Sequence, residues 1–191
     1  MATPEPELEP GNQQGTQPAG ALAERVRSLV REVPDFPLPG ILFRDITPLL
    51  ADAPTFAALV ESWAQDHAGI DVVAGVEARG FIFAAPLAIR LGAGFVPVRK
   101  SGKLPGATER ASYALEYGTA TLEVTYDAFR AGQRVLLVDD VLATGGTAAA
   151  ACELIERSGA EVAAVQVLVE LAALGGRDRL AGRDVRATFA V

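Results

Sequence analysis

Apolar and polar positions along this chain form blocks that switch between two periods. Short apolar runs between turn residues are typical of buried strands, and apolar residues repeating every three or four positions are typical of helices. The apolar stripe from Leu22 to Val30 predicts a helix that ends before Pro34. The same patterns predict helices over 54–67, 80–91 and 146–157, and strands over 71–76, 94–99, 112–118, 121–125, 135–138, 162–169 and 185–189.

Strands that alternate with helices predict an α/β fold, in which a central, mainly parallel sheet is flanked by helices. Strands 112–118 and 121–125 are close enough in sequence to form a hairpin, and residues 36–40 predict a rigid, non-helical turn. Ligands of such sheets bind at the carboxyl ends of the strands, at a topological switch point. The residues that follow strand 135–138 are therefore the first place to look for a site.

The segment from 135 to 147 carries the strongest chemical pattern in the chain. Its apolar strand is followed by Asp139 and Asp140, and then by a turn rich in hydroxyls and glycines that opens a helix. Backbone N–H groups at a helix start bind anions, and glycines let the backbone approach a phosphate closely. Ionised carboxylates only accept hydrogen bonds, which suits the 2- and 3-hydroxyls of a ribose. The pattern predicts a site for a ribose with a 5-phosphate, whose turn consists of Ala143, Thr144, Gly145, Gly146 and Thr147.

Two other phosphate-binding motifs are excluded for this segment. No Lys follows the glycines, so the turn is not a Walker phosphate loop. The spacing Gly-x-Gly-x-x-Gly is absent there as well, which excludes a dinucleotide-binding fingerprint.

Two further turns supply positive charge. Ala78 and Arg79 lie between a predicted strand and a predicted helix, and they offer N–H groups and a guanidinium to an anion. Arg99, Lys100 and Lys103 follow another strand directly and would neutralise a departing pyrophosphate. The stretch from these cations to residue 117 mixes Gly, Pro and charges, which is typical of a mobile lid that excludes water. The alternative for Ala78 and Arg79 is a helix start with a surface Arg, and the alternative for the turn after Arg99 is a solvated basic turn.

Single side chains outside these turns also have alternative roles. Phe43 lies outside any periodic run and could stack on a flat base, and the alternative is a core position. Glu116 could exchange a proton with a purine ring nitrogen, and the alternative is an exposed strand acid. Cys152 is expected to be a small core residue, and His67 a solvated residue at a helix end.

Composition limits the class of protein. The chain has 191 residues, half of them hydrophobic, which suits one domain with a sizeable core, expected over 21–191. Residues 1–20 are acidic and almost without apolar side chains, so we expect a disordered tail rather than a signal peptide. A net charge of −7 gives no indication of nucleic-acid or membrane partners. A single cysteine and the lack of a transmembrane run favour the cytoplasm.

Residues 135–147 resemble the phosphoribosyl-diphosphate signature of the type I phosphoribosyltransferases. Together with 36–46, 75–81, 99–106 and 112–118, in this order, they resemble the adenine phosphoribosyltransferase family. The likeness covers nearly all of the chain after residue 21, although Ser101 lies where many relatives place Arg or Pro.

The resemblance implies a type I phosphoribosyltransferase fold with a small hood and a flexible lid loop. It also implies a pentosyl transfer of purine salvage, in which adenine and phosphoribosyl diphosphate give AMP and pyrophosphate with Mg²⁺. The metal would be held through substrate oxygens and water, with no direct protein ligand. A homodimer is implied too, in which Arg99, Lys100 and Lys103 reach pyrophosphate partly across the interface.

The resemblance further implies a role for each matching residue. Asp139 and Asp140 would hold the ribose hydroxyls, and the turn 143–147 would cradle the 5-phosphate. Pyrophosphate would bind at Ala78 and Arg79, beside an expected cis peptide between Glu77 and Ala78. Adenine would lie between Phe43 and Leu171, and backbone groups of Leu42 and Arg44 would recognise its polar edge. Glu116 would transfer a proton, and Tyr117 would help to close the lid.

Two alternatives stay open. A phosphoribosyltransferase for hypoxanthine, xanthine or orotate would keep the same fold, although the block 36–46 matches the adenine enzymes. A regulatory protein that senses purines or phosphoribosyl diphosphate would lack the catalytic loop or carry a DNA-binding extension. This chain has Glu116 and Lys103, and its first twenty residues are acidic, so we favour the enzyme.

Overall fold

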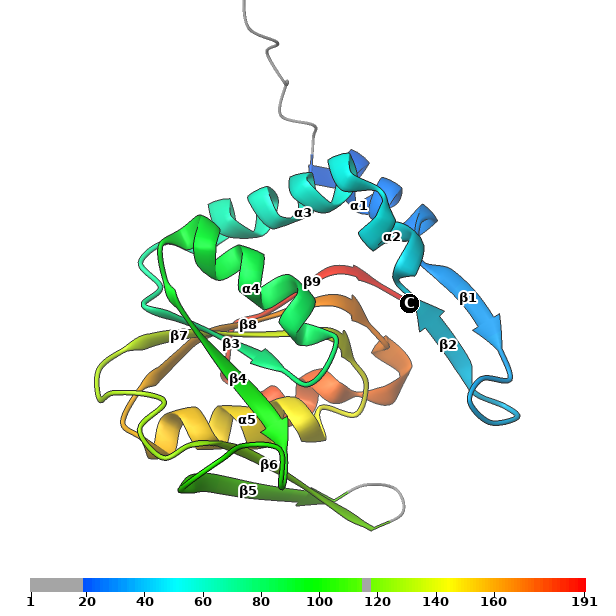
Figure 1. Ribbon diagram of the computed structural model, residues 1–191. Coiled ribbons are helices and arrows are strands. Elements are labelled where there is room, and N and C mark those ends of the chain that lie inside the picture. The colour runs from blue at the N-terminus through cyan, green and yellow to red at the C-terminus, as the bar shows by residue number, and fades with distance from the viewer. Residues whose placement is uncertain (1–18, 115–117) are drawn as a thin grey trace, which may run out of the picture.

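The computed structural model describes residues 19–114 and 118–191 (Figure 1). Within these residues a seven-stranded sheet in the order β5-β6-β4-β3-β7-β8-β9 forms the centre, and a two-stranded hairpin, β1-β2, lies apart from it. The strands are β1 (Arg31–Pro34), β2 (Leu42–Asp45), β3 (Val72–Val76), β4 (Gly94–Lys100), β5 (Thr108–Ala114), β6 (Thr119–Thr125), β7 (Arg134–Leu142), β8 (Glu161–Glu170) and β9 (Val185–Ala190). The helices are α1 (Ala19–Ser28), α2 (Thr47–Ala51), α3 (Ala53–Asp66), α4 (Gly80–Leu91) and α5 (Gly146–Arg157), with short 3-10 turns η1 (Ala172–Leu174) and η2 (Gly176–Leu180).

The sheet is parallel at its centre and antiparallel at one edge. Strands β4, β3, β7, β8 and β9 run parallel, and β6 and β5 add an antiparallel hairpin beside β4. All residues of β3 are buried, as expected for a central strand with helices on both faces. The predicted mainly parallel sheet is therefore confirmed.

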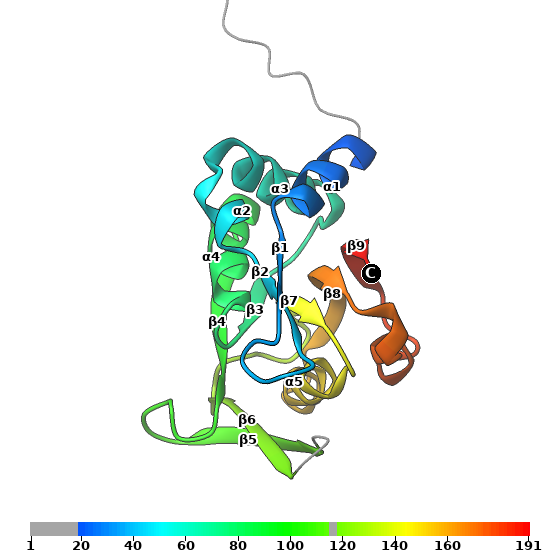
Figure 2. The ribbon, with the colours of Figure 1, turned by 90° about the vertical axis from the view of Figure 1, so that its right-hand side faces the viewer.

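Two apolar cores flank the sheet. One lies between the sheet and α5, and the other lies between the sheet and α1, α3 and α4 (Figures 1 and 2). The hairpin β1-β2 lies to the right of the central sheet in Figure 1 and in front of it in Figure 2, in the position of a hood. No helix among residues 19–114 and 118–191 is long and apolar enough to span a bilayer.

The helices were predicted more accurately than the short strands. Helices 80–91 and 146–157 have the predicted limits, and α4 ends where Gly92 takes the left-handed conformation at φ 66°. Strands β1 and β2 were not predicted, because each has only four residues and no clear alternation. The first helix ends at Ser28, before the last residue of its apolar stripe. The predicted strand 112–118 begins earlier, at Thr108, and its residues 115–117 lie outside the described residues.

One prediction about an isolated side chain was wrong. His67 is buried, with 4% of its surface exposed, and its Nε2 lies 2.9 Å from Oε1 of Gln166. Because α3 packs against the sheet, its end points at β8 rather than at solvent, and burial lowers the pKa of His67. The prediction for Cys152 is confirmed, because it is fully buried in the core beneath α5, where burial raises its pKa to about 11.

Candidate functional site

The turn between β7 and α5 is built around two glycines that approach each other closely. Gly145 has φ 79°, and a Cβ at this position would lie 2.3 Å from the carbonyl oxygen of Gly176. A Cβ at Gly176 would lie 2.1 Å from the carbonyl oxygen of Ala143. The turn lines a cavity of about 80 Å³ together with Asp139. Because the first N–H groups of a helix have no partner within the helix, this cavity suits a phosphate.

The two acids lie inside β7 rather than after it. Asp139 is half-buried and Asp140 is 5% exposed. Burial, with the neighbouring charge of Asp140, raises the pKa of Asp139 well above its usual range. Burial also raises the pKa of Asp140, although the guanidinium of Arg79 opposes this shift. Two adjacent carboxylates in a confined space gain from hydrogen-bond donors, and ribose hydroxyls are such donors.

Gly80 brings the start of α4 against the acid pair. A Cβ on Gly80 would lie 2.7 Å from the carbonyl oxygen of Val138, so only glycine allows this approach. Arg79 therefore reaches the acids, and its Nε lies 2.9 Å from Oδ2 of Asp140. This oxygen is buried and accepts no hydrogen bond of good geometry from the described residues, so it can receive another donor.

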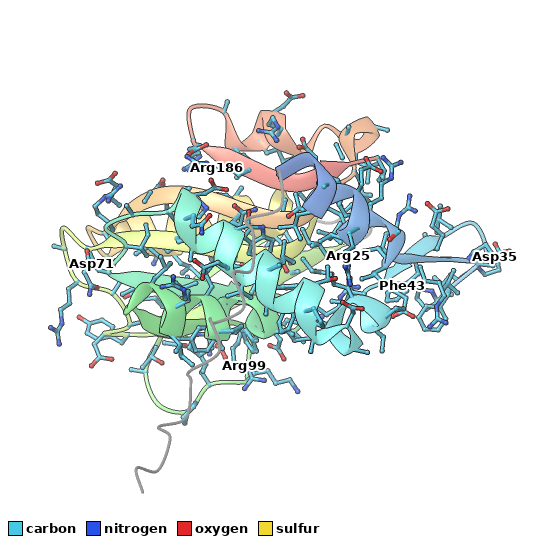
Figure 3. All side chains as sticks on the ribbon, turned by 90° about the horizontal axis from the view of Figure 1, so that it is seen from above. Arg25, Asp35, Phe43, Asp71, Arg99 and Arg186 are labelled. Carbon is cyan, nitrogen blue, oxygen red and sulfur yellow. The ribbon has the colours of Figure 1, made fainter. Side chains whose placement is uncertain are left out.

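Arg79 also contacts the hood. Its Nη1 donates to the backbone carbonyl of Arg44 at 3.2 Å, and its guanidinium carbon lies 5.0 Å from the centre of the Phe43 ring. Figure 3 shows Phe43 at the base of the projecting hairpin, whose tip carries Asp35. One side chain thus links the predicted ribose site to the predicted base site.

The basic turn after β4 is attached to the turn that carries Arg79. The carboxylate of Glu77 accepts hydrogen bonds from Nη2 of Arg99 at 3.1 Å and from the backbone N–H of Lys100 at 2.9 Å. These bonds lower the pKa of Glu77, with the Arg99 bond as the largest cause. The peptide between Glu77 and Ala78 is cis, as expected. Arg99 is therefore held in an ion pair, whereas Lys100 and Lys103 are exposed.

The structure assembles part of the predicted set and adds residues that were not predicted. Asp140, Arg79, Arg44 and Phe43 are in contact, and the turn 143–147 adjoins Asp139. Leu171 follows β8, where its N–H donates to the carbonyl of Leu142 at 2.9 Å, and Leu42 is exposed at the start of β2. Ala78 is exposed beside Arg79, and Glu116 and Tyr117 lie outside the described residues.

The residues that sequence reasoning missed are Glu77, Glu123 and Tyr113. The hydroxyl of Tyr113 accepts from Thr147 at 3.1 Å, which joins β5 to the phosphate turn. Glu77 lies two residues before Arg79, next to the predicted anion turn. Its negative charge at that place was the one sign in the sequence that it could take part in the site. The contact of Tyr113 joins β5 to the start of α5, and those of Glu123 join β6 to the turn after β4, so no local pattern indicates them.

This chain is similar in sequence to known phosphoribosyltransferases. A family model described as phosphoribosyl transferase domain matches residues 49–186. The adenine phosphoribosyltransferase of Acidothermus cellulolyticus is 58% identical over 176 residues, which cover 91% of this chain and 99% of the relative. That of Kineococcus radiotolerans is 60% identical over 169 residues, covering 85% and 91%.

Solved structures give the same result. The adenine phosphoribosyltransferase of Thermoanaerobacter pseudethanolicus superposes with a TM-score of 0.86 at 49% identity, covering 88% of this chain and 99% of the other. The Saccharomyces cerevisiae enzyme, crystallised with an imino-altritol bisphosphate and adenine, gives a TM-score of 0.84 at 39% identity, covering 89% and 99%.

The close approach of Gly145 and Gly176 leads to a prediction. Gly176→Ala should displace the turn, because its Cβ would lie 2.1 Å from the Ala143 carbonyl oxygen and 3.0 Å from the Gly145 nitrogen. We expect the Kd for ribose 5-phosphate, measured by calorimetry, to rise roughly tenfold or more, a change of about 1.4 kcal/mol. Gly94→Ala is the matched control, because its nearest neighbour atom lies 3.7 Å away. Equal affinities in the two variants would contradict this account of the turn.

Proposed function

We propose a role for each part of the site on one premise: the chain belongs to the adenine phosphoribosyltransferase family. It transfers the 5-phosphoribosyl group of phosphoribosyl diphosphate to adenine, giving AMP and pyrophosphate, as in purine salvage. The observation that carries the assignment of roles is the contact of Arg79 with Asp140 on one side and with Phe43 and Arg44 on the other. Through this contact the guanidinium of Arg79 lies beside both the acid proposed to bind ribose, Asp140, and the ring proposed to stack on the base, Phe43.

The sugar and its phosphate would bind at the end of β7. Asp139 and Asp140 accept hydrogen bonds from the ribose hydroxyls, and donors at these oxygens relieve the repulsion between the two neighbouring charges. The turn formed by Ala143, Thr144, Gly145, Gly146 and Thr147 holds the 5-phosphate at the start of α5. Binding at both points fixes the direction of the ribose ring and therefore the position of its C1 atom.

Adenine would bind beneath the hood. Phe43 and Leu171 lie on either side of the ring, and backbone groups of Leu42 and Arg44 contact its polar edge. The amino group of adenine would donate to the Arg44 carbonyl, which accepts from Arg79 in this structure. A carbonyl oxygen has two lone pairs, so it can accept from Arg79 and from adenine together.

The leaving group needs positive charge. Ala78 offers its N–H group, and Arg79, Arg99, Lys100 and Lys103 are the cations at this edge of the sheet.

Among the described residues, no cluster of three or more His, Cys, Asp or Glu side chains is arranged to bind a metal. The buried Oδ2 of Asp140 is still a hard oxygen of the kind that Mg²⁺ prefers, so the acid pair fits an ion carried by the substrate and water. When bound, Mg²⁺ would neutralise charge on pyrophosphate.

The reaction needs no covalent nucleophile from the protein. Holding the two reactants in line contributes up to about 7–11 kcal/mol to lowering the barrier. Glu116 exchanges a proton with a purine ring nitrogen, and Tyr117 helps to close the lid over the site, which excludes water from the activated ribose. Residues 21–191 act as the enzymatic domain without residues 1–20, in the cytoplasm.

A homodimer is the second part of the proposal, and an apolar surface supports it. Ile82 and Ile89, two turns apart on α4, are 39% and 83% exposed, and Phe95 on the adjacent β4 is 39% exposed. Figure 2 shows α4 and β4 together along one side of the protein. Apolar side chains gathered on one surface mark an interaction site, and a twofold dimer buries the same patch of both copies. Because β4 leads into the basic turn, this interface would bring the turn of one protomer near the site of its partner.

Base choice tests the proposed activity. The protein is incubated with Mg²⁺, phosphoribosyl diphosphate and either adenine, hypoxanthine, guanine or xanthine, and pyrophosphate release is measured. Hypoxanthine presents a carbonyl where adenine has an amino group, so the Arg44 carbonyl would face a lone pair, at a cost of about 1–3 kcal/mol and more from repulsion. We expect kcat/KM for adenine to exceed that for the other bases by at least roughly a hundredfold. Comparable turnover of hypoxanthine would assign another base, and no turnover of any base would favour a purine-sensing regulator.

The dimer has its own test. Sedimentation at micromolar concentration should give about twice the chain mass of 19.9 kDa. Ile89→Asp should yield monomers, because a carboxylate would be buried in the interface. Tyr126→Asp is the control, since Tyr126 is an exposed aromatic residue outside this surface, at 69% exposure. A fully active wild-type monomer would contradict a site shared between two protomers.

A further inference from the structure

The carboxylate of Glu123 is fully buried, although nothing in the predicted reaction uses it. Glu123 lies in β6 and is 0% exposed. In the sheet it is paired with Arg99 on β4 and with Arg110 on β5. Burying a charged carboxylate is costly unless hydrogen bonds and opposite charges compensate. Such a residue at the edge of a site therefore calls for an explanation.

The carboxylate of Glu123 contacts the backbone of the basic turn and two side chains of β5. Its Oε1 accepts hydrogen bonds from the backbone N–H groups of Lys103 and Leu104, at 2.9 and 3.0 Å. Its Oε2 lies 3.3 Å from Nε of Arg110 and 3.4 Å from the hydroxyl of Thr108. Burial alone would raise the pKa of Glu123, but the backbone donors and the charge of Arg110 lower it, so the group is ionised at neutral pH.

The backbone of Lys103 is held from both sides. Its N–H donates to Glu123, and its carbonyl accepts from Nη1 of Arg99 at 3.0 Å. Arg99 is held in turn by the carboxylate of Glu77, beside the turn that carries Arg79. The residues between β4 and β5 form no helix or strand. Their shape therefore depends on a series of contacts that runs from Glu123 through Lys103 and Arg99 to Glu77.

We propose that Glu123 is a positioning residue, which fixes the backbone of Lys103 so that its exposed ammonium group meets pyrophosphate. This inference rests on the proposed function, because it assigns Lys103 to the leaving group. Glu123 touches no substrate and acts through Lys103. Arg99 also contacts this backbone, because its Nη1 donates to the Lys103 carbonyl while its Nη2 is paired with Glu77. Misplacing a charge by about 1 Å is enough to cost substantial transition-state stabilisation.

A double-mutant cycle separates positioning from general stabilisation of the fold. The Kd for pyrophosphate with Mg²⁺ is measured by calorimetry for wild type, Glu123→Leu, Lys103→Ala and the double variant. Glu123→Leu should raise the Kd roughly tenfold, about 1.4 kcal/mol. The double variant should bind no more weakly than Lys103→Ala alone, because without the ammonium group there is nothing left to position. Additive effects, or an unchanged Kd in Glu123→Leu, would overturn the proposal.

Two variants serve as controls for this cycle. Glu123→Gln keeps an oxygen that can accept from both N–H groups, so it should restore much of the affinity lost in Glu123→Leu. Glu109→Gln removes an ion-paired acid of the neighbouring β5, whose partner Arg157 lies on α5, and should leave the Kd unchanged. An equal loss of pyrophosphate affinity in Glu123→Leu, Glu123→Gln and Glu109→Gln would show that removing any acidic charge from this sheet has the same effect. That result would also contradict a positioning role for Glu123.

Hydrogen exchange on the wild-type protein provides a test that does not depend on the folding of a variant. The amide hydrogens of Lys103 and Leu104 should be protected although they lie in a turn, because Glu123 accepts both. Exchange at the rate of an unstructured peptide would overturn the proposal. Neither measurement requires adenine. If wild type failed to turn over adenine but the cycle were non-additive, the proposed function would fail and the positioning role would stand.

Discussion

The ion pair between Arg79 and Asp140 is the interaction on which the site depends. It forms because Gly80 lets the start of α4 approach the end of β7 more closely than any other residue would. The pair joins β7 of the central sheet to the start of α4. The same guanidinium also contacts the Phe43 ring and the Arg44 carbonyl of the hood. Without this contact the ribose site and the base site would be two separate surfaces.

Acidic residues hold the cations of this site in place. The chain has a net charge of −7, so it attracts a polyanionic substrate through local groups rather than through its overall field. Arg79, Arg99 and the turn around Lys103 are each held by a carboxylate, namely Asp140, Glu77 and Glu123. A cation that is already ordered loses less entropy on binding than a free side chain. The acids around the site therefore contribute to binding an anion, although their own charge opposes it.

Features that depend only on neighbouring residues could be predicted from the sequence. The limits of α4 and α5, the acid pair and the glycine turn were all predicted, because periodicity and motif spacing are contained in neighbouring residues. The close contact of Gly145 with Gly176 and the contact of Arg79 with Arg44 join segments far apart in the chain, so no local pattern indicates them. For the same reason His67 was assigned to solvent: a helix end is exposed by default, and only the packing of α3 on β8 buries it. Glu123 was missed because a buried acid in a strand has the same sequence pattern as an exposed one.

The central claim is that Asp139 and Asp140 bind the ribose of phosphoribosyl diphosphate, and calorimetry of that ligand with Asp139→Asn/Asp140→Asn tests it most directly. Each acid loses a charged hydrogen bond worth about 1.5–3 kcal/mol, so the Kd should rise by roughly a hundredfold or more while the circular dichroism of the fold is retained. Asp184→Asn, at the opposite end of the sheet beside Arg186, should leave the Kd unchanged. A double variant that binds phosphoribosyl diphosphate as tightly as wild type would contradict the account.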